Sequence, residues 1–323
     1  MVIPETYPNE THTIEGDDWH ELRLRNIGGS EIAGLFDMEQ PYQLSRYGLY
    51  MVKSKQAKDD FEGNERTEWG NRLEAAIAHG IAEDNGWTIR KGGYFSDPET
   101  PGLGSTLDYI IESDPDFDGP GALEIKNVDG LVFCDKWVDD EPPEHILLQL
   151  QHQLAASGFK WGAIGALVNG NTTHVYKYAA RPNLIAEIRR RVNQFWQDVR
   201  DGVVPPIDGS DNSKRIAQAI NTPVKIETVD RSDDPAFAEI CREYEETRAA
   251  VKAAQELHDI AKNRLIAVYG GDKKSEGNGW RVTVSVTPAK PDRVAKPGEI
   301  IPGRAETRRY IVCRKTPEFM PGI

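Results

Sequence analysis

The amino-acid sequence predicts an α/β (α+β) fold in which helices flank a central mixed β-sheet, followed by a C-terminal helical arm and a small β-hairpin. Two observations predict this fold. Segments with the apolar spacing of amphipathic helices recur along the first part of the chain, at 67–87, 139–158 and 183–202. Short segments that alternate apolar and polar residues, as strands do, lie between these helices, at 88–127 and 161–178.

Local sequence signals predict the helices and strands of the first part of the chain. The segment 27–36 is a glycine turn followed by a helix start, with Ser30 as the candidate N-cap. The helix over 67–87 carries apolar residues at i, i+4 intervals and ends at Gly86. Turn residues then separate the short strands predicted over 88–127.

The next three elements have equally clear signals. The helix over 139–158 begins with acidic residues and ends at Gly158. The strands over 161–178 form a hairpin around "NGNT". The helix over 183–202 is strongly amphipathic, so we expect one side of it to pack on the core.

A stretch rich in Pro, Gly, Asp and Ser (203–213) predicts a boundary between a first domain, 1–205, and an appendage, 206–323. The appendage begins with a long helical pattern over 234–271, with apolar residues at alternating intervals of three and four. Several positions of that pattern are small or polar, so we expect a short helical hairpin arm rather than a long coiled coil. Two later segments alternate apolar and polar residues, as in a small sheet: 279–286 and 308–314.

Composition leaves the function open. The net charge of −13 over 323 residues disfavours a general nucleic-acid binder, although an enzyme with a local basic groove is compatible with it. We expect no membrane span, because no run of about 18 apolar residues exists. The first residues show no secretory-signal pattern. Three scattered cysteines predict neither a metal cluster nor a disulfide framework, so we expect a reducing, cytoplasmic setting.

Asp108, Glu124 and Lys126 form the pattern with the most chemical content. Asp108 lies in "GLGSTLDYII" (102–111), Glu124 and Lys126 lie in "LEIK", and a turn-rich link between them predicts two adjacent antiparallel strands. The two carboxylates can then meet, which is unfavourable without a counter-ion. Oxygen ligands suit Mg²⁺ or Mn²⁺, and Lys126, on the strand face of Glu124, would lie beside the ion and orient a water.

Each of these residues also has a simpler interpretation. Glu-x-Lys triplets are common ion pairs on solvated strands, and a single aspartate is more often a turn residue. Glu74, on the core-facing side of the helix over 67–87, is either a further acidic ligand or a surface glutamate. The helix over 139–158 carries a polar stripe that either lies over the site or faces water: Gln149, His152, Gln153 and Ala156.

Asp108 followed by Glu124-Ile125-Lys126 resembles the signature of the PD-(D/E)xK nucleases. A wider pattern resembles the YqaJ-like viral recombinases, relatives of phage lambda exonuclease, over about residues 15–205. Five blocks occur in the order of that family: "WHELRLRNIGGSEIAGLF" (19–36), "WGNRLEAAIA" (69–78), "STLDYII" (105–111), "LEIK" (123–126) and "LQLQHQLAASGFKWGAIGALVNG" (148–170).

This resemblance implies a restriction-endonuclease-like core and an enzyme, a deoxyribonuclease of the exonuclease type. Such enzymes load on double-stranded DNA ends and degrade one strand 5′ to 3′ with Mg²⁺, or with Mn²⁺ in its place. They leave 3′ overhangs for phage-type recombination by single-strand annealing. The resemblance also implies a single-strand annealing protein as partner, a homo-oligomer such as a ring, and the cytosol of a bacterial or phage-infected cell.

The resemblance further implies a role for individual residues. The metal ligands would be Asp108, Glu124, the carbonyl of Ile125 and Glu74. Lys126 would assist the nucleophilic water. The terminal 5′-phosphate and the DNA would be held by Arg23, Ser30, Gln149 and Gln151.

Two other functions are compatible with the same sequence. One is a non-catalytic module that binds DNA ends or a partner and has kept the nuclease fold; the intact Asp, Glu and Lys weigh against it. The other is a structure-selective endonuclease with the same site. The appendage, 206–323, would serve oligomerisation, DNA contact or partner contact in any of these cases.

Overall fold

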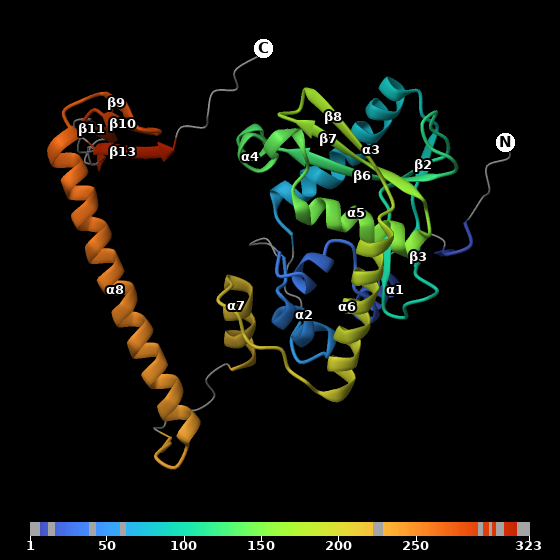
Figure 1. Ribbon diagram of the computed structural model, residues 1–323, viewed down its shortest axis with the longest axis horizontal. Helices are drawn as coiled ribbons and strands as arrows, with labels where there is room; N and C mark the ends of the chain where they lie inside the picture. The colour runs from blue at the N-terminus through green and yellow to red at the C-terminus, as the bar shows by residue number, and fades with distance from the viewer. Residues whose placement is uncertain are drawn as a thin grey trace. The chain divides into compact units, whose positions relative to one another are not determined.

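The computed structural model describes residues 7–11, 17–38, 43–58, 63–221, 229–289, 293–296, 299–301 and 307–314, without the side chains of 17–20, 140 and those beyond 289. The chain forms two compact units, Met1–Lys225 and Ile226–Ile323. The predicted fold class is confirmed: a mixed sheet flanked by helices forms the first unit, and a long helix and small sheets form the second (Figure 1).

A five-stranded sheet lies at the centre of the first unit. Its strand order is β2-β5-β6-β7-β8, with β6 and β7 parallel and the other neighbours antiparallel. Its strands are β2 (Ile89–Lys91), β5 (Tyr109–Ile111), β6 (Gly121–Val128), β7 (Trp161–Val168) and β8 (Thr172–Ala179). A three-stranded antiparallel sheet of order β1-β3-β4 consists of β1 (Glu10–Thr11), β3 (Tyr94–Ser96) and β4 (Gly104–Thr106).

Helices α3 (Glu65–Asn85) and α5 (Glu144–Ser157) cover opposite faces of the five-stranded sheet (Figure 1). Strand side chains alternate between the two faces of a sheet. On β6, Leu123 and Ile125 pack with α3, whereas Ala122 belongs to the core on the α5 side. The polar residues between them on β6 must therefore face α5.

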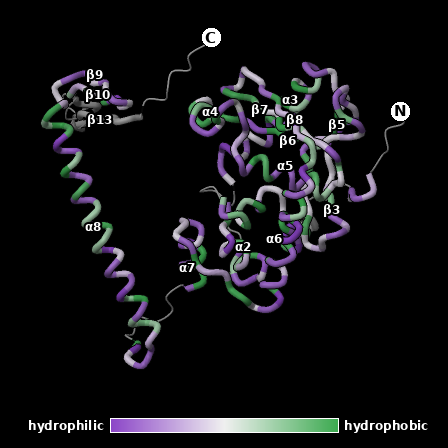
Figure 2. Tube along the Cα trace, in the orientation of Figure 1, coloured by the Kyte–Doolittle hydropathy of each residue, from purple (hydrophilic) through white to green (hydrophobic). Residues whose placement is uncertain are grey.

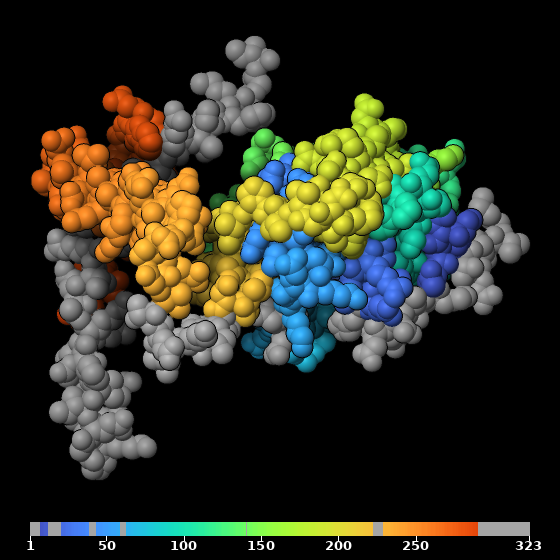
Figure 3. Space-filling view, turned by 90° about the horizontal axis from the view of Figure 1, so that it is seen from below, coloured from blue at the N-terminus to red at the C-terminus, as the bar shows by residue number. Residues whose placement is uncertain are grey.

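The remaining helices of the first unit surround this core. They are α1 (Asp17–Arg25), η1 (Ile32–Leu35), α2 (Arg46–Lys53), α4 (Gly130–Lys136), η2 (Val138–Asp140), α6 (Pro182–Asp201) and α7 (Asp211–Ile220). Helix α6 buries Ile188, Val192 and Phe195 on one side, as its amphipathic pattern predicts. Its other side lies at the surface, next to α2 (Figure 3).

The chain passes between the two sheets twice, and the second passage positions Asp108. Strand β2 continues into β3 through Gly92 and Gly93, and β4 continues into β5 through Leu107 and Asp108. Backbone bonds join the two passages, from the Leu107 N–H to the Gly93 carbonyl and from the Gly92 N–H to the Asp108 carbonyl, both 3.1 Å. A Cβ on Gly92 would lie 2.3 Å from the Leu107 carbonyl oxygen, so only glycine allows this approach.

Capping explains where α3 begins and ends. Asn64 accepts a hydrogen bond from the Thr67 N–H at the start of the helix, and Gly86 ends it in the left-handed conformation, as its position in the sequence predicts. The predicted helix start at Ser30 is wrong. The short helix there is η1, and its N-cap position is Glu31 rather than Ser30.

The helix predicted over 139–158 begins later than expected. Asp139 has a φ of 55°, and Pro143 precedes the first turn, so the chain turns before α5 starts at Glu144. Gly158 ends the helix in the left-handed conformation, as predicted. The late start leaves the polar stripe of this helix unchanged.

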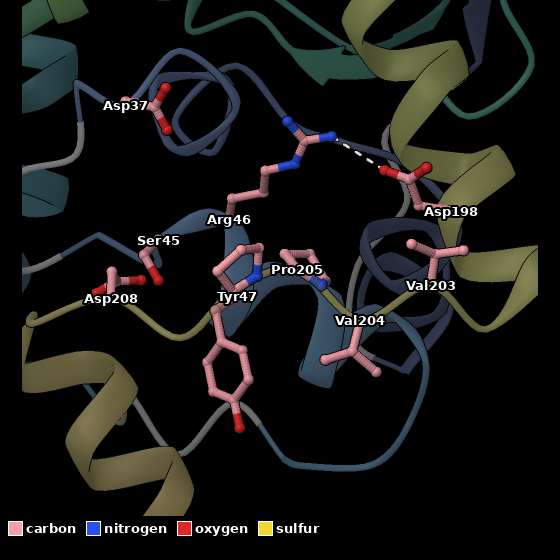
Figure 4. Close-up of a pocket in the computed structure, with 10 residues that line it drawn as sticks. Asp37, Ser45, Arg46, Tyr47, Asp198, Val203, Val204, Pro205 and Asp208 are labelled. Carbon is pink, nitrogen blue, oxygen red and sulfur yellow. Dashed lines mark hydrogen bonds and ion pairs between the residues drawn. The ribbon is translucent and has the colours of Figure 1, made fainter. Parts of the chain in front are cut away.

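The predicted boundary at residue 205 falls inside the first unit, because α7 is attached to α2. The Ser213 hydroxyl lies 3.0 Å from that of Ser45 and donates to Asp208 at 2.8 Å. Figure 4 shows the cavity of about 390 Å³ that the segment 203–208 forms with α2 and α6, where Arg46 pairs with Asp198 at 3.0 Å. The Arg46–Asp198 pair and the hydrogen bonds among Ser45, Ser213 and Asp208 connect the walls of this cavity.

The second unit contains α8 (Pro235–Tyr269), β9 (Lys274–Gly277), β10 (Trp280–Thr287), β11 (Arg293–Lys296), β12 (Glu299–Ile301) and β13 (Thr307–Arg314). Strand β10 pairs antiparallel with β9 and β13, as the two alternating segments predict, and β11 pairs with β12. The expected helical hairpin is wrong, since α8 is one continuous helix. Among the described residues, no helix is long and apolar enough to cross a membrane.

Candidate active site

Strand β6 places Glu124 and Lys126 inside the first unit. Because neighbouring side chains on a strand point to opposite faces, Leu123 and Ile125 pack with α3 while Glu124 and Lys126 face α5. Glu124 is only 2% exposed, and such a carboxylate is tolerated only where hydrogen bonds and positive charge compensate its burial.

Three side chains provide that compensation for Glu124. The ammonium of Lys126 donates to Glu124 Oε1 at 2.5 Å. The side-chain amides of Gln149 and Gln153, both on α5, donate to Oε1 at 2.7 Å and to Oε2 at 2.5 Å. Lys126 also donates to Gln149 Oε1 at 3.2 Å, so these four side chains form one hydrogen-bonded cluster. The polar stripe of α5 therefore faces the sheet and not water.

Asp108 joins this cluster from the end of β5. The backbone pairing of β5 with β6 ends at Tyr109 and Leu123. Beyond this point, a side chain of the β5 segment takes the place of a backbone acceptor. The Asp108 Oδ2 accepts the Ile125 N–H at 2.8 Å. Because the N–H and C=O of one strand residue point to the same side, the Ile125 carbonyl faces this edge as well.

The pKa of Asp108 is affected by the other acidic residues nearby. Burial raises the pKa of Asp108 well above its usual value, and the negative charges of Glu124 and Glu74 raise it further. The charge of Lys126 and the hydrogen bond from Ile125 oppose this increase without cancelling it. An added positive charge at this point would therefore stabilise the ionised carboxylate.

Glu74 lies at the rim of the site, on α3. Its carboxylate pairs with Lys91 of β2, and Lys91 Nζ also lies 4.8 Å from the centroid of the Tyr109 ring. Burial alone would lower the pKa of Lys91, but the hydrogen bond and charge of Glu74, with the charge of Asp108, raise it. Within the described residues, no three Asp, Glu, His or Cys side chains form a ready metal-binding group.

A small cavity of about 110 Å³ lies between the loop after α1, β4 and α5. Arg23 and Ser30 line it together with Gln149, which is far from both in the sequence. Gly29 forms part of its wall, where a Cβ would lie 2.8 Å from the Ser105 hydroxyl and 3.3 Å from the Gln149 side chain. The volume and the polar lining suit a small anion such as a phosphate group.

Tyr94 is a further polar residue of the cavity wall. The residue is 5% exposed and lines the cavity, and its hydroxyl oxygen is buried without a hydrogen-bond partner in the described part of the chain. A buried unsatisfied hydroxyl costs about 1–3 kcal/mol, so a hydrogen-bond acceptor bound beside it would stabilise the protein.

A buried ion pair holds the C-terminal end of α1, which carries Arg23, and the loop that follows it. Lys53 donates to both oxygens of Glu31, at 2.7 and 2.9 Å, and to the backbone carbonyls of Arg23 and Asn26. Glu31 in turn accepts from Arg23 at 3.2 Å and from the Gly28 N–H at 2.8 Å. This network fixes both the backbone and the guanidinium of Arg23 beside the cavity.

Gln151 is the one predicted site residue that the structure does not bring to this group. Its amide donates to the Ala179 carbonyl at 3.1 Å and accepts the Arg181 N–H at 2.7 Å. Both polar atoms are therefore used between β8 and the start of α6. The other predicted residues lie around Glu124, at its rim or along the cavity.

Sequence reasoning missed Tyr94, Lys91 and the Lys53–Glu31 pair, and it gave Gln153 no definite role. The polar stripe of α5 was a signal for Gln153, but periodicity alone does not tell a face over a site from a solvated face. No signal in the sequence identifies Lys53, because lysines are rarely buried and its partner is far away along the chain.

Fold and site together define an α/β protein with a carboxylate–lysine cluster next to an anion-sized cavity. Residues 18–160 match the model of the YqaJ-like viral recombinase domain. Over these residues the chain is therefore similar to that family, and the predicted resemblance is confirmed.

Known proteins show further similarity. The chain is 28% identical to the uncharacterized protein YqaJ of Bacillus subtilis over 202 residues, which is 60% of either chain. It thus spans about 60% of the length of that relative. An alkaline exonuclease (LHK-Exo) from Laribacter hongkongensis has a TM-score of 0.49 and 19% identity, covering 64% of this chain and 100% of that one. A phage-related exonuclease from Haemophilus somnus has a TM-score of 0.40 and 12% identity, covering 55% and 95%.

Proposed function

We propose that this chain is a Mg²⁺-dependent deoxyribonuclease that degrades one strand of double-stranded DNA from a 5′ end and leaves 3′ overhangs. One observation carries the proposal. Gln149 belongs to the Glu124–Lys126 cluster and also lines the cavity that contains Arg23 and Ser30. A site for a terminal phosphate and a site for cleavage would thus share a side chain, as an enzyme that acts at DNA ends requires.

The residues present suit a divalent cation. Asp108, Glu124 and the Ile125 carbonyl offer oxygen donors, which Mg²⁺ and Mn²⁺ prefer, and Glu74 is a further acidic group at the rim. The raised pKa of Asp108 marks a point where negative charge lacks compensation. A cation bound there supplies Lewis-acid assistance to phosphodiester hydrolysis.

The protein's own side chains would carry the other roles. Gln149 and Gln153 hold the Glu124 carboxylate in one orientation, which preorganises it. The Lys126 ammonium, 27% exposed, can orient the attacking water and stabilise negative charge on the phosphate. Arg23, Ser30 and Tyr94 would bind the terminal 5′-phosphate, for which a guanidinium offers two parallel donors.

The similarity to the YqaJ-like family supports a proposal for the wider setting of this activity. We propose that the 3′ overhangs serve recombination by single-strand annealing, with an annealing protein as partner and a homo-oligomer as the active form. We also propose that the enzyme acts in the cytosol. Co-purification of the chain with a single-strand annealing protein tests the partner.

A digestion assay on linear duplex DNA tests the activity. The substrate carries a label at one 5′ end and is incubated with Mg²⁺, Mn²⁺ or a chelator. We expect nucleotide release that needs a divalent cation and a chain with an intact Lys126. Lys126→Ala and Asp108→Ala should abolish release while binding to DNA ends in a gel-shift assay survives, because neither residue lines the cavity.

A pair of arginine variants tests end recognition. Arg23→Ala should remove the preference for 5′-phosphorylated over 5′-hydroxyl ends. Arg25→Ala, on the same helix but paired with Glu21 and absent from the cavity, is the matched control and should keep this preference.

Full nuclease activity in Lys126→Ala would refute the mechanism. No release with either metal would favour a non-catalytic end-binding module, and cleavage of covalently closed circles would favour an endonuclease.

A further inference from the structure

Helix α8 presents an apolar surface that is largely exposed among the described residues; only Leu265 and Ile266, near its C-terminal end, are half-buried. The helix is described over its whole length and has no buried residue. Figure 2 shows apolar residues interspersed with hydrophilic ones along it. Large apolar and aromatic side chains are exposed on it, namely Phe237, Ile240, Tyr244, Val251, Leu257, Ile260, Val268 and Tyr269. Most helices in proteins depend on packing of an apolar face, so this exposure indicates a partner.

The apolar residues of α8 follow a heptad pattern. Intervals of three and four alternate without interruption along one side of the helix, which we call the seam. The seam consists of Phe237, Ile240, Tyr244, Thr247, Val251, Ala254, His258, Ala261, Leu265 and Val268. A sustained seven-residue repeat is the signature of a helix that pairs with another helix in a left-handed coiled coil.

We propose that α8 pairs antiparallel, along its whole length, with α8 of a second copy of this chain. In this alignment the alanines of the seam each meet a larger residue on the other helix. Tyr244 faces Ala261, and Val251 faces Ala254. The polar seam residues then also share one layer, because Thr247 faces His258. Further out, Ile240 packs with Leu265 and Phe237 with Val268.

A parallel, in-register pair would pack less well. It would place Ala254 and Ala261 each against its own copy, which leaves voids, and it would place the two Tyr244 rings in one layer. Interiors are close-packed, and both voids and crowding destabilise them. The antiparallel alignment also matches the helix ends, because it brings Pro235 next to Tyr269 of the second copy.

Residues beside the seam agree with the antiparallel alignment. Positions that flank the seam face their equivalents in an antiparallel pair. Glu243 then faces Arg264 of the second copy, which gives an ion pair on each side of the symmetry axis. Leu257, which is 68% exposed on the single helix, faces Ala250 and becomes covered. Charge and apolar surface are thus both complementary in this one register.

Cross-linking tests the direction of pairing in the full chain. Cys134, Cys241 and Cys313 are first replaced by serine, and Phe237→Cys or Val268→Cys is then introduced. When the two variants are co-expressed with different tags, we expect a mixed cross-linked dimer. Either variant alone should not cross-link, because the two positions lie about 46 Å apart along a helix.

Charge reversal tests the register. Glu243→Arg should lower the yield of the mixed cross-link about tenfold, since it removes two ion pairs and adds two repulsions. Adding Arg264→Glu should restore the yield. Glu256→Arg, which makes the same charge change on the side of α8 opposite the seam, is the matched control and should have no effect.

Each alternative has its own outcome. Cross-linking of Phe237→Cys to itself, or rescue of Glu243→Arg by Arg248→Glu, would establish a parallel pair and overturn the proposal. The absence of any cross-link between copies would overturn it as well. These readouts do not depend on nuclease activity, so the proposal stands or fails separately from the proposed function.

Discussion

Replacing Lys53 with methionine should destabilise the first unit by about 3–5 kcal/mol, because it leaves a buried carboxylate without its main partner. The Lys53 and Glu31 side chains are only 1% and 9% exposed. Methionine fills a similar volume, but Glu31 loses the ammonium and keeps the contacts with Arg23 and the Gly28 N–H. At roughly 2–4 °C per kcal/mol for a unit of this size, the unfolding midpoint should fall by about 6–20 °C.

The loss should depend on pH in a defined direction. Burial would raise the pKa of Glu31, but the charges of Lys53 and Arg23 outweigh it and hold the pKa below the usual 4.5. A depressed pKa in the folded state gives stability that is present above 4.5 and is lost as the pH falls through the folded-state value. The difference between wild type and Lys53→Met should therefore be large at pH 7 and shrink below pH 4.5.

Urea unfolding at pH 7 and pH 4, followed by circular dichroism, measures both effects. Adding Glu31→Gln to Lys53→Met removes the unpaired charge and should recover part of the lost stability. The folded fraction of Lys53→Met should also show a weaker preference for 5′-phosphorylated ends, since Lys53 holds the Arg23 backbone. A loss below 1 kcal/mol at pH 7, or a difference that does not shrink in acid, would refute this account of the buried pair.

Three further substitutions separate binding, orientation and folding. Tyr94→Phe should leave the unfolding midpoint unchanged or higher, because it removes an unsatisfied buried hydroxyl, and should weaken the 5′-phosphate preference in competition digests. Gln153→Leu should lower the rate of nucleotide release about 10–100-fold without unfolding the protein, because Glu124 loses an orienting hydrogen bond; an unchanged rate would remove Gln153 from the site. Gln151→Ala should cost about 1–2 kcal/mol in denaturant unfolding, because the Arg181 N–H loses its acceptor, and leave the rate per folded molecule intact; a selective loss of phosphate preference would instead return Gln151 to the phosphate site.

Alternation along one strand made the centre of the site predictable from sequence. Glu124 and Lys126 must share a face of β6, because strand side chains alternate, and the apolar residues between them require burial of the other face. The position of Asp108 depends on the passage between two sheets, which alternation along a strand does not predict. That passage needs Gly92 to approach Leu107 closely, a contact between residues that no local pattern links.

Other features were beyond sequence reasoning for physical reasons. The unsatisfied Tyr94 hydroxyl and the buried Lys53–Glu31 pair depend on tertiary packing, which polarity patterns do not encode. For α8, the small and polar seam residues suggested a break into a helical hairpin. The seam is continuous instead, and Ala254 and Ala261 become favourable once a partner helix places larger residues opposite them.

Gln149 gives a physical reason for coupling end recognition to cleavage. Its amide oxygen accepts from Lys126, its amide nitrogen donates to Glu124, and its side chain forms part of the cavity wall. A phosphate in the cavity that draws the amide nitrogen toward itself weakens a hydrogen bond to Glu124. The Glu124 carboxylate then depends more on Gln153 and Lys126, and on any cation that it holds. If a phosphate occupies the cavity as proposed, it would thus change the electrostatics of the proposed cleavage site through one side chain, without movement of the sheet.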